Sequence, residues 1–173
     1  MAASLYGHFH VPVVRHLLEA GADVDAKNDC GETALMLASE SGFIVHGRID
    51  IVKLHLNAGA VVDSKSDTGR TALMCASCSG RNEILELLLE AGADKDAKNC
   101  NGYTALMSAS KNDKTYTVEF LLEMGADQEA KTVRDWTALM YASRENRLDA
   151  IEVAEGSNQV PRSANRELSW GQY

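Results

Sequence analysis

The sequence predicts an all-α solenoid, in which helix–turn–helix units stack on one another and project turn or loop fingers. Two short motifs recur along the 173-residue chain. The tetrapeptide Thr-Ala-Leu-Met begins at Thr33, Thr71, Thr104 and Thr137, and a Gly-Ala pair begins at Gly21, Gly59, Gly92 and Gly125. Both series have spacings of 38, 33 and 33 residues. Because two independent motifs share one irregular spacing, they mark a repeated structural unit.

Each unit carries the signals of two short helices. Thr71 is a typical N-cap, and small and apolar side chains follow it as a first helix. The second helix covers residues 82–91, where Ile and Leu occupy most of the circumference, and Gly92 supplies a left-handed position after its last turn. One helix pair cannot bury that much apolar surface alone, so the units must stack.

The repeated residues Gly-x-Thr-Ala-Leu-Met-x-Ala-Ser and Ile-Leu-Glu-Leu-Leu-Leu-Glu-Ala-Gly-Ala-Asp resemble the ankyrin repeat, whose period is also 33 residues. The family usually has Thr-Pro-Leu-His at its turn, where this chain has Thr-Ala-Leu-Met. Ala should cost little at the first helical position because it is a good helix former. Met replaces the hydrogen-bonding His by an apolar filler. The resemblance implies an ankyrin-repeat solenoid.

The array is predicted to cover residues 1–155 in about five units. Complete units are 31–68, 69–101 and 102–134, a partial unit with its second helix at 13–19 covers 2–30, and a degenerate unit covers 135–155. The segment 43–47 accounts for the longer first spacing. Residues 156–173 are polar and are predicted to form a disordered tail. Because both end units are incomplete, we expect the chain to be a segment of a longer array or the product of an incomplete gene model.

The charge balance disfavours several classes of partner. The chain has 17 Lys and Arg against 25 Asp and Glu, for a net charge of -8, whereas nucleic-acid binding needs a basic surface. No apolar run approaches the roughly 18 residues that a membrane-spanning helix needs. The four cysteines have no secretory context, so a reducing intracellular compartment is expected, the cytoplasm first and the nucleus as the alternative.

The motifs that resemble metal or catalytic sites are better explained by the repeat. Cys75 and Cys78 have the spacing of a zinc or redox pair, but they lie on a predicted helix, one semi-buried and the other solvated. The motif Asp94-x-Asp96 resembles the start of a calcium loop, yet Lys98 and Asn99 do not continue that loop, and the motif recurs in register. No catalytic triad or phosphate-binding loop is present, so we expect no catalysis, metal or cofactor.

The resemblance implies that a partner protein binds on the concave side of the array, at the fingertips and along the first helices. Units that otherwise repeat one another differ most at these positions, and Tyr, Trp and Arg are the residue types that anchor interfaces. The predicted main contacts are Tyr103, Arg134, Trp136 and Arg144, Arg70 comes next, and Lys111, Glu32 and Glu40 complete the set. Along the array this surface changes from acidic to mixed, and then to aromatic and basic.

Three features of the surface have two interpretations each. The rings of Tyr103 and Trp136 either contact a partner or only cover their own turns. Lysines recur in one register at Lys27, Lys65, Lys98 and Lys131. This row either steers acidic segments of a partner or keeps the surface solvated. The insertion 43–47 either makes a second contact or packs on its own unit.

The sequence therefore predicts a non-enzymatic protein–protein interaction module, an adaptor or scaffold, whose partner protein is not identified. It is expected to bind neither nucleic acid nor membrane, and to be a monomer or part of a longer chain. The alternative is a regulatory or substrate-recruiting fragment of a larger ankyrin-containing enzyme or channel, such as a kinase, a ubiquitin ligase or a transferase. A thiol or metal sensor is a third hypothesis.

Overall fold

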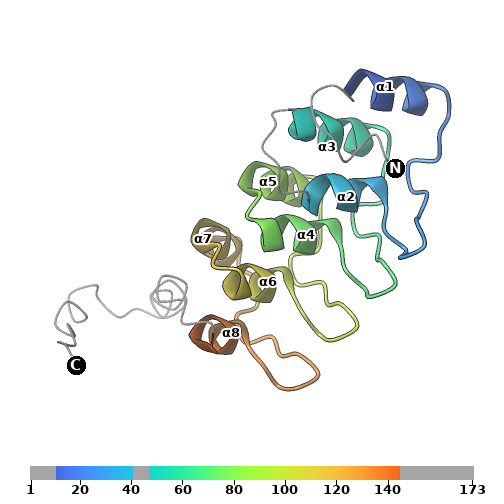
Figure 1. Cartoon of the computed structure of the whole chain (residues 1–173). Coiled ribbons are helices and arrows are strands. Elements are labelled where there is room, and N and C mark those ends of the chain that lie inside the picture. The colour runs from blue at the N-terminus through green and yellow to red at the C-terminus, as the bar shows by residue number, and fades with distance from the viewer. Residues whose placement is uncertain (1–10, 41–46, 145–173) are drawn as a thin grey trace, which may run out of the picture.

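The structure is a computed structural model, and it describes residues 11–40 and 47–144. Predictions about residues 2–4, 43–46, 145–155 and 156–173 lie outside the described residues. The described ranges form the helices α1 (Val11–Glu19), α2 (Ala34–Glu40), α3 (Gly47–Asn57), α4 (Ala72–Ser79), α5 (Asn82–Glu90), α6 (Ala105–Lys111), α7 (Thr115–Glu123) and α8 (Ala138–Arg144). Within those ranges β-pairing is limited to one isolated bridge, between Lys27 and Thr33. The predicted all-α solenoid is confirmed (Figure 1).

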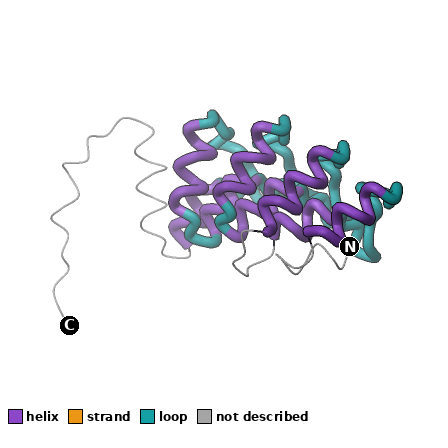
Figure 2. Tube along the Cα trace, turned by 90° about the horizontal axis from the view of Figure 1, so that it is seen from above, coloured by secondary structure: helices purple, strands orange, loops and turns teal. Residues whose placement is uncertain are grey.

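The helices form two layers. The first helices α2, α4, α6 and α8 pack each on the next, and the second helices α1, α3, α5 and α7 do the same. Figure 2 shows the helices of successive units side by side along the array. We call the loops that join one unit to the next fingers; they cover residues 20–33, 58–71, 91–104 and 124–137. All the fingers project to the same side of the stack, beside the layer of first helices (Figure 1).

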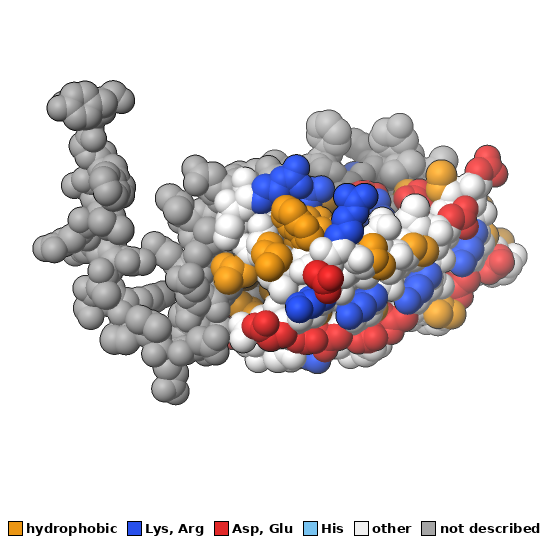
Figure 3. All heavy atoms as spheres, turned by 90° about the horizontal axis from the view of Figure 1, so that it is seen from below, with side chains coloured by type: hydrophobic (Ala, Val, Ile, Leu, Met, Phe, Trp, Pro, Cys, Tyr) orange, Lys and Arg blue, Asp and Glu red, His pale blue; other side chains and the backbone are white. Residues whose placement is uncertain are grey.

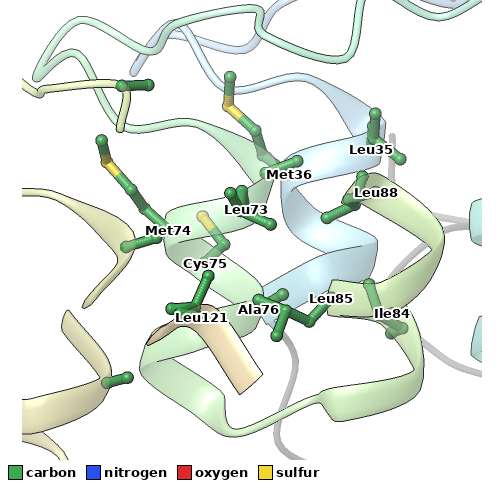
Figure 4. Packing of buried hydrophobic residues seen from close by; sticks show 14 of the residues in the cluster. Leu35, Met36, Leu73, Met74, Cys75, Ala76, Ile84, Leu85, Leu88 and Leu121 are labelled. Atoms are coloured by element: carbon green, nitrogen blue, oxygen red, sulfur yellow. The ribbon is translucent and has the colours of Figure 1, made fainter. Parts of the chain in front are cut away.

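The first helices begin as the sequence predicts. The hydroxyl of Thr71 accepts a hydrogen bond from the backbone N–H of Met74 at 3.4 Å, and Thr104 caps α6 in the same way. The apolar side chains that follow fill the space between units, and Leu73 and Met74 are at most 2% exposed. Figure 4 shows them with Leu85 of α5 and with side chains of α2. Met therefore serves as a buried filler, as expected from its replacement of His.

Two helix ends differ slightly from the prediction. Helix α1 begins at Val11 and not at residue 13, because Pro12 is tolerated in a first turn, where its missing N–H needs no partner. Helix α5 ends at Glu90, one residue earlier than predicted. Gly92 has φ 89°, so the predicted left-handed position after the second helix is confirmed.

Neighbouring fingers are joined by backbone hydrogen bonds. The N–H groups of Asp67, Cys100 and Val133 donate to the carbonyl oxygens of Cys30, Thr68 and Asn101 in the preceding fingers, each at 3.0 Å. Each of the last three fingers is thus held in register by the one before it. The stack is therefore supported by polar contacts at the fingers as well as by apolar contacts between helices.

The aspartates of the calcium-like motif lie in the fingers and link adjacent units. The Asp94 carboxylate accepts from the N–H of Asp96 at 3.0 Å, and that of Asp96 accepts from the N–H of Asp127 in the next finger at 2.8 Å. Burial opposes the charge on Asp96, but the hydrogen bond from Asp127 and the ammonium group of Lys95 outweigh it and lower its pKa. The motif thus caps its own turn and binds the next unit.

The register of lysines has a role that neither sequence interpretation included. The ammonium group of Lys27 donates to the carbonyl oxygen of Lys65 at 2.8 Å, and that of Lys65 donates to the carbonyl oxygen of Lys98 at 2.9 Å. Figure 3 shows a row of basic side chains that runs beside a row of acidic ones along the array. At least two of the lysines therefore connect successive units.

The leading glycine of each unit is required by the next finger. Gly102 has φ 77°, and a Cβ placed on it would lie 2.8 Å from the Cα of Thr132. Asp135 occupies the same position in the last unit, also in a left-handed conformation with φ 59°. No finger follows it within the described part of the chain, so its Cβ meets no such backbone. This difference explains how the last unit tolerates the loss of glycine.

Candidate partner-binding site

The predicted contacts lie on the surface formed by the fingers and the exposed sides of α2, α4, α6 and α8. We call this surface the finger face; it contains the fingertips and first helices where the resemblance predicts that a partner binds. Residues at the base of a finger reach residues at the C-terminal end of a first helix, as Arg70 reaches Glu40 and Trp136 reaches Arg144. These contacts show that both sets of positions belong to one surface.

Four residues of the finger face form a continuous group, which we call the aromatic cluster: Tyr103, Trp136, Tyr141 and Arg144. The ring centroids of Tyr103 and Tyr141 are 4.7 Å apart, and those of Trp136 and Tyr141 are 5.0 Å apart. The guanidinium carbon of Arg144 lies 5.4 Å from the centroid of the Trp136 ring, within cation–π distance. The rings are tilted by 46° and 43°, an arrangement that aromatic pairs favour over flat stacking.

The cluster is assembled from two units. Tyr103 stands at the end of the finger that leads into α6, and Trp136 at the end of the finger that leads into α8. The two backbones close their own turns, since the N–H of Tyr103 donates to Asn99 and that of Trp136 donates to Thr132. Both rings also pack on Tyr141 of α8, which lies outside both turns. Their role in binding a partner remains a prediction.

Tyr141 is a member of the cluster that the sequence prediction did not include. It occupies the position held by Leu37, Cys75 and Ser108 in the other first helices. Its side chain is half-buried, and it contacts both other rings of the cluster. An aromatic residue at a register position where the other units have smaller side chains was the available signal.

Arg70 and Glu40 are bound to each other. A guanidinium nitrogen of Arg70 lies 2.6 Å from a carboxylate oxygen of Glu40, and both side chains are half-buried. Burial opposes the charge on Arg70, but the hydrogen bond to Glu40 outweighs it and raises the pKa of the guanidinium. A partner would have to compete with this pair, so these two predicted contacts are less available than the others.

The other predicted contacts are spread along the face. Glu32 accepts a hydrogen bond from the Asn28 side chain at 3.0 Å within its own finger. Lys111, at the end of α6, and Arg134, in the last described finger, are both exposed. Within the described ranges neither side chain has a hydrogen-bond or ion-pair partner. The structure thus brings Tyr103, Trp136 and Arg144 together and leaves Glu32 at the other end of the array.

The cysteine pair does not form a site. Cys75 is 2% exposed, so the prediction that it is semi-buried is wrong, and burial raises the pKa of its thiol to about 12. Cys78 is half-buried and not fully solvated, because the amide of Asn112 lies 3.4 Å from its sulfur. Helix α4 packs on both α2 and α6, and Cys75 is buried there while Cys78 stays partly exposed. In the described part of the chain, no group of three His, Cys, Asp or Glu residues could hold a metal ion.

The fold defines a helical-repeat solenoid in which the fingers and first helices form one continuous face. The family model for ankyrin repeats, in three copies, matches residues 1–99 and 91–155, so the chain belongs to the ankyrin-repeat family. Ankyrin repeats are generally protein–protein interaction modules and are typically non-catalytic. No curated protein matches the sequence. None of the described helices has the length and apolar character needed to cross a membrane.

Proposed function

We propose that this protein is an adaptor or scaffold that binds a partner protein on its finger face, with the aromatic cluster as the main anchor. The observation that carries the proposal is the contact of Tyr103, Trp136 and Tyr141 in one group beside Arg144. Tyr, Trp and Arg dominate the binding energy of protein interfaces, and they do so where they cluster. Rings that already pack on one another also lose little freedom on binding, which favours affinity.

The rigidity of the array supports this proposal. The fingers that carry Tyr103 and Trp136 are joined through the hydrogen bond between the N–H of Val133 and the carbonyl of Asn101, at 3.0 Å. This bond restrains the distance between the two anchors, so a partner meets a surface that is already formed. In a binding module, affinity then comes from a few anchored side chains and not from the whole buried area.

The experiment is a quantitative affinity purification with the wild-type chain, the Tyr103→Ala, Trp136→Ala double variant and a Tyr116→Ala control. Tyr116 is 50% exposed on α7 of the other helix layer, where it stacks on Phe120, so it removes an exposed aromatic residue elsewhere. We expect specific partners that the double variant loses and the control keeps. Partners retained equally by all three proteins would refute the finger face as the binding surface. Circular dichroism of each variant establishes that it is folded.

A further inference from the structure

We infer that the partner binds through an acidic segment, in which Asp or Glu residues flank an aromatic or aliphatic side chain. The apolar side chain lies on the aromatic cluster, and the carboxylates pair with Lys111, Arg134 and Arg144. This inference rests on the proposed function and names the partner's chemistry. It begins from a charge separation on the finger face that the chain's net charge of -8 conceals.

The C-terminal end of the finger face is basic. Lys111, Arg134 and Arg144 are exposed there, and within residues 47–144 none of them has a carboxylate partner. The same finger also carries Asp127 and Glu129, but Asp135 is the acidic residue next to Trp136, and the three cations outnumber it. Figure 3 shows basic side chains beside hydrophobic ones at this end of the array.

The N-terminal end of the face has the opposite character. Asp29 and Asp67 are exposed in the first two fingers, Glu32 lies beside them, and the cation of Arg70 is already paired with Glu40. An acidic segment is therefore attracted to the units of α6 and α8 and repelled by those of α2 and α4. Such complementarity sets the position and direction of a bound segment more than its affinity.

Arg144 is placed where a carboxylate can reach it beside an aromatic ring. Its guanidinium lies over the Trp136 ring, 5.4 Å from the centroid. An exposed guanidinium at cation–π distance from a ring still has N–H donors that a carboxylate can accept, two at a time. Because the contact with Trp136 already restricts the arginine, less side-chain freedom is lost when the ion pair forms.

The aromatic part of the cluster supplies the apolar half of the site. Tyr103, Trp136 and Tyr141 are each half-buried, so part of every ring still faces solvent. An aromatic or aliphatic side chain can cover these surfaces beside the cation of Arg144. The site is thus complementary to a segment in which an apolar side chain and a carboxylate lie close together.

Single-stranded nucleic acid also combines negative charge with stacking groups, but the rest of the face disfavours it. A phosphate backbone that followed the array would be repelled by the exposed carboxylates of Asp67 and Asp29. In addition, the ammonium groups of Lys27 and Lys65 are already bonded to carbonyl oxygens. A short acidic protein segment avoids that region since it needs only the last two units. We therefore expect peptide and not nucleic acid.

The test is a selection of random displayed peptides on the whole chain, followed by fluorescence anisotropy with the recovered peptides and with a labelled oligouridylate. We expect Asp and Glu enriched next to Phe, Trp, Tyr or Leu, binding that weakens with added salt, and no comparable binding of oligouridylate. Arg144→Gln should weaken the selected peptides by at least about fivefold, and Arg144→Lys by less, because it keeps the charge but loses the planar fork. Lys53→Gln removes the same charge from the exposed side of α3 and should change affinity by less than about twofold.

The outcomes separate this inference from the proposed function. The inference would be overturned if the selected peptides depended on Trp136 but showed no enrichment of acidic residues. It would also be overturned if Arg144→Gln and Lys53→Gln weakened binding equally. In both cases the finger face would remain the binding surface. No selectable peptide, or binding that Trp136→Phe and Tyr103→Ala leave unchanged, would overturn both. If oligouridylate bound more tightly than any peptide, we would conclude that the partner is a nucleic acid and not a protein. Thermal denaturation of each variant excludes unfolding as the cause of a loss.

Discussion

The contact between successive fingers can be measured by replacing Gly102 with Ala. Gly102 has φ 77°, and a left-handed backbone costs an L-residue about 1–2 kcal/mol. The new Cβ would also lie 2.8 Å from the Cα of Thr132 and 3.1 Å from the nitrogen of Val133, both backbone atoms that cannot rotate away. The finger must then shift and weaken the hydrogen bond from Val133 to Asn101, which contributes about 0.5–1.5 kcal/mol. We expect Gly102→Ala to lower the free energy of unfolding by about 2–3 kcal/mol.

Gly92→Ala is the matched control for this prediction. Gly92 has φ 89°, and nothing lies within 4 Å of a Cβ placed on it, so only the cost of the backbone conformation applies. Both variants change the unfolded chain equally, and their difference isolates the contact between fingers. Urea denaturation followed by circular dichroism gives the two free energies, and hydrogen exchange of the Val133 amide reports the local effect. If Gly102→Ala is no more destabilising than Gly92→Ala, the fingers do not support each other as argued.

Three further outcomes follow from single contacts. Asp135→Gly should raise the free energy of unfolding by about 0.5–1 kcal/mol, because glycine relieves the left-handed strain at φ 59°; a loss of stability in urea denaturation would contradict this. The Cys75 thiol, with its pKa raised to about 12, should resist an aromatic disulfide reagent near pH 8 while exposed Cys30 reacts, and rapid labelling of folded Cys75 would disprove its burial. Because the buried thiol keeps its proton up to about pH 12 and the unfolded one loses it near pH 9, this group should leave the free energy of unfolding unchanged below about pH 9 and lower it as the pH rises towards 12. Glu40→Gln should cost at most about 1 kcal/mol, since its pair with Arg70 is partly exposed; a loss of several kcal/mol in thermal denaturation would show that the pair is structural.

Much of the fold could be predicted because the same capping and turn residues recur in successive units. Thr71 caps its helix, Gly92 takes the left-handed conformation, and both are determined by residues within one turn of the chain. The predicted start of α1 is two residues late, since the first turn of a helix accepts a proline such as Pro12.

Less of the candidate site could be predicted. Tyr103, Trp136 and Arg144 were identified from their variation between units, and the structure brings them together. Tyr141, which joins the two other rings, is not among the predicted contacts because Cys75, at the same register position in another unit, is predicted to be semi-buried. The pair between Arg70 and Glu40 was also missed, since the two residues are predicted contacts in different units and 30 positions apart.

The sequence by itself determined the architecture of this protein: the period, the presence of two helices in each unit, the need to stack and the positions at which the units vary. These follow from local backbone preferences and from apolar surface that one unit cannot bury. Only the tertiary structure decided which side chains meet across units, such as Tyr103 with Tyr141 and Lys65 with the carbonyl of Lys98, and that Cys75 is fully buried. The physical reason is that such contacts depend on the rotation and spacing between stacked units. That rotation and spacing are set by the packing of both helix layers together, so the sequence of a single repeat does not determine them.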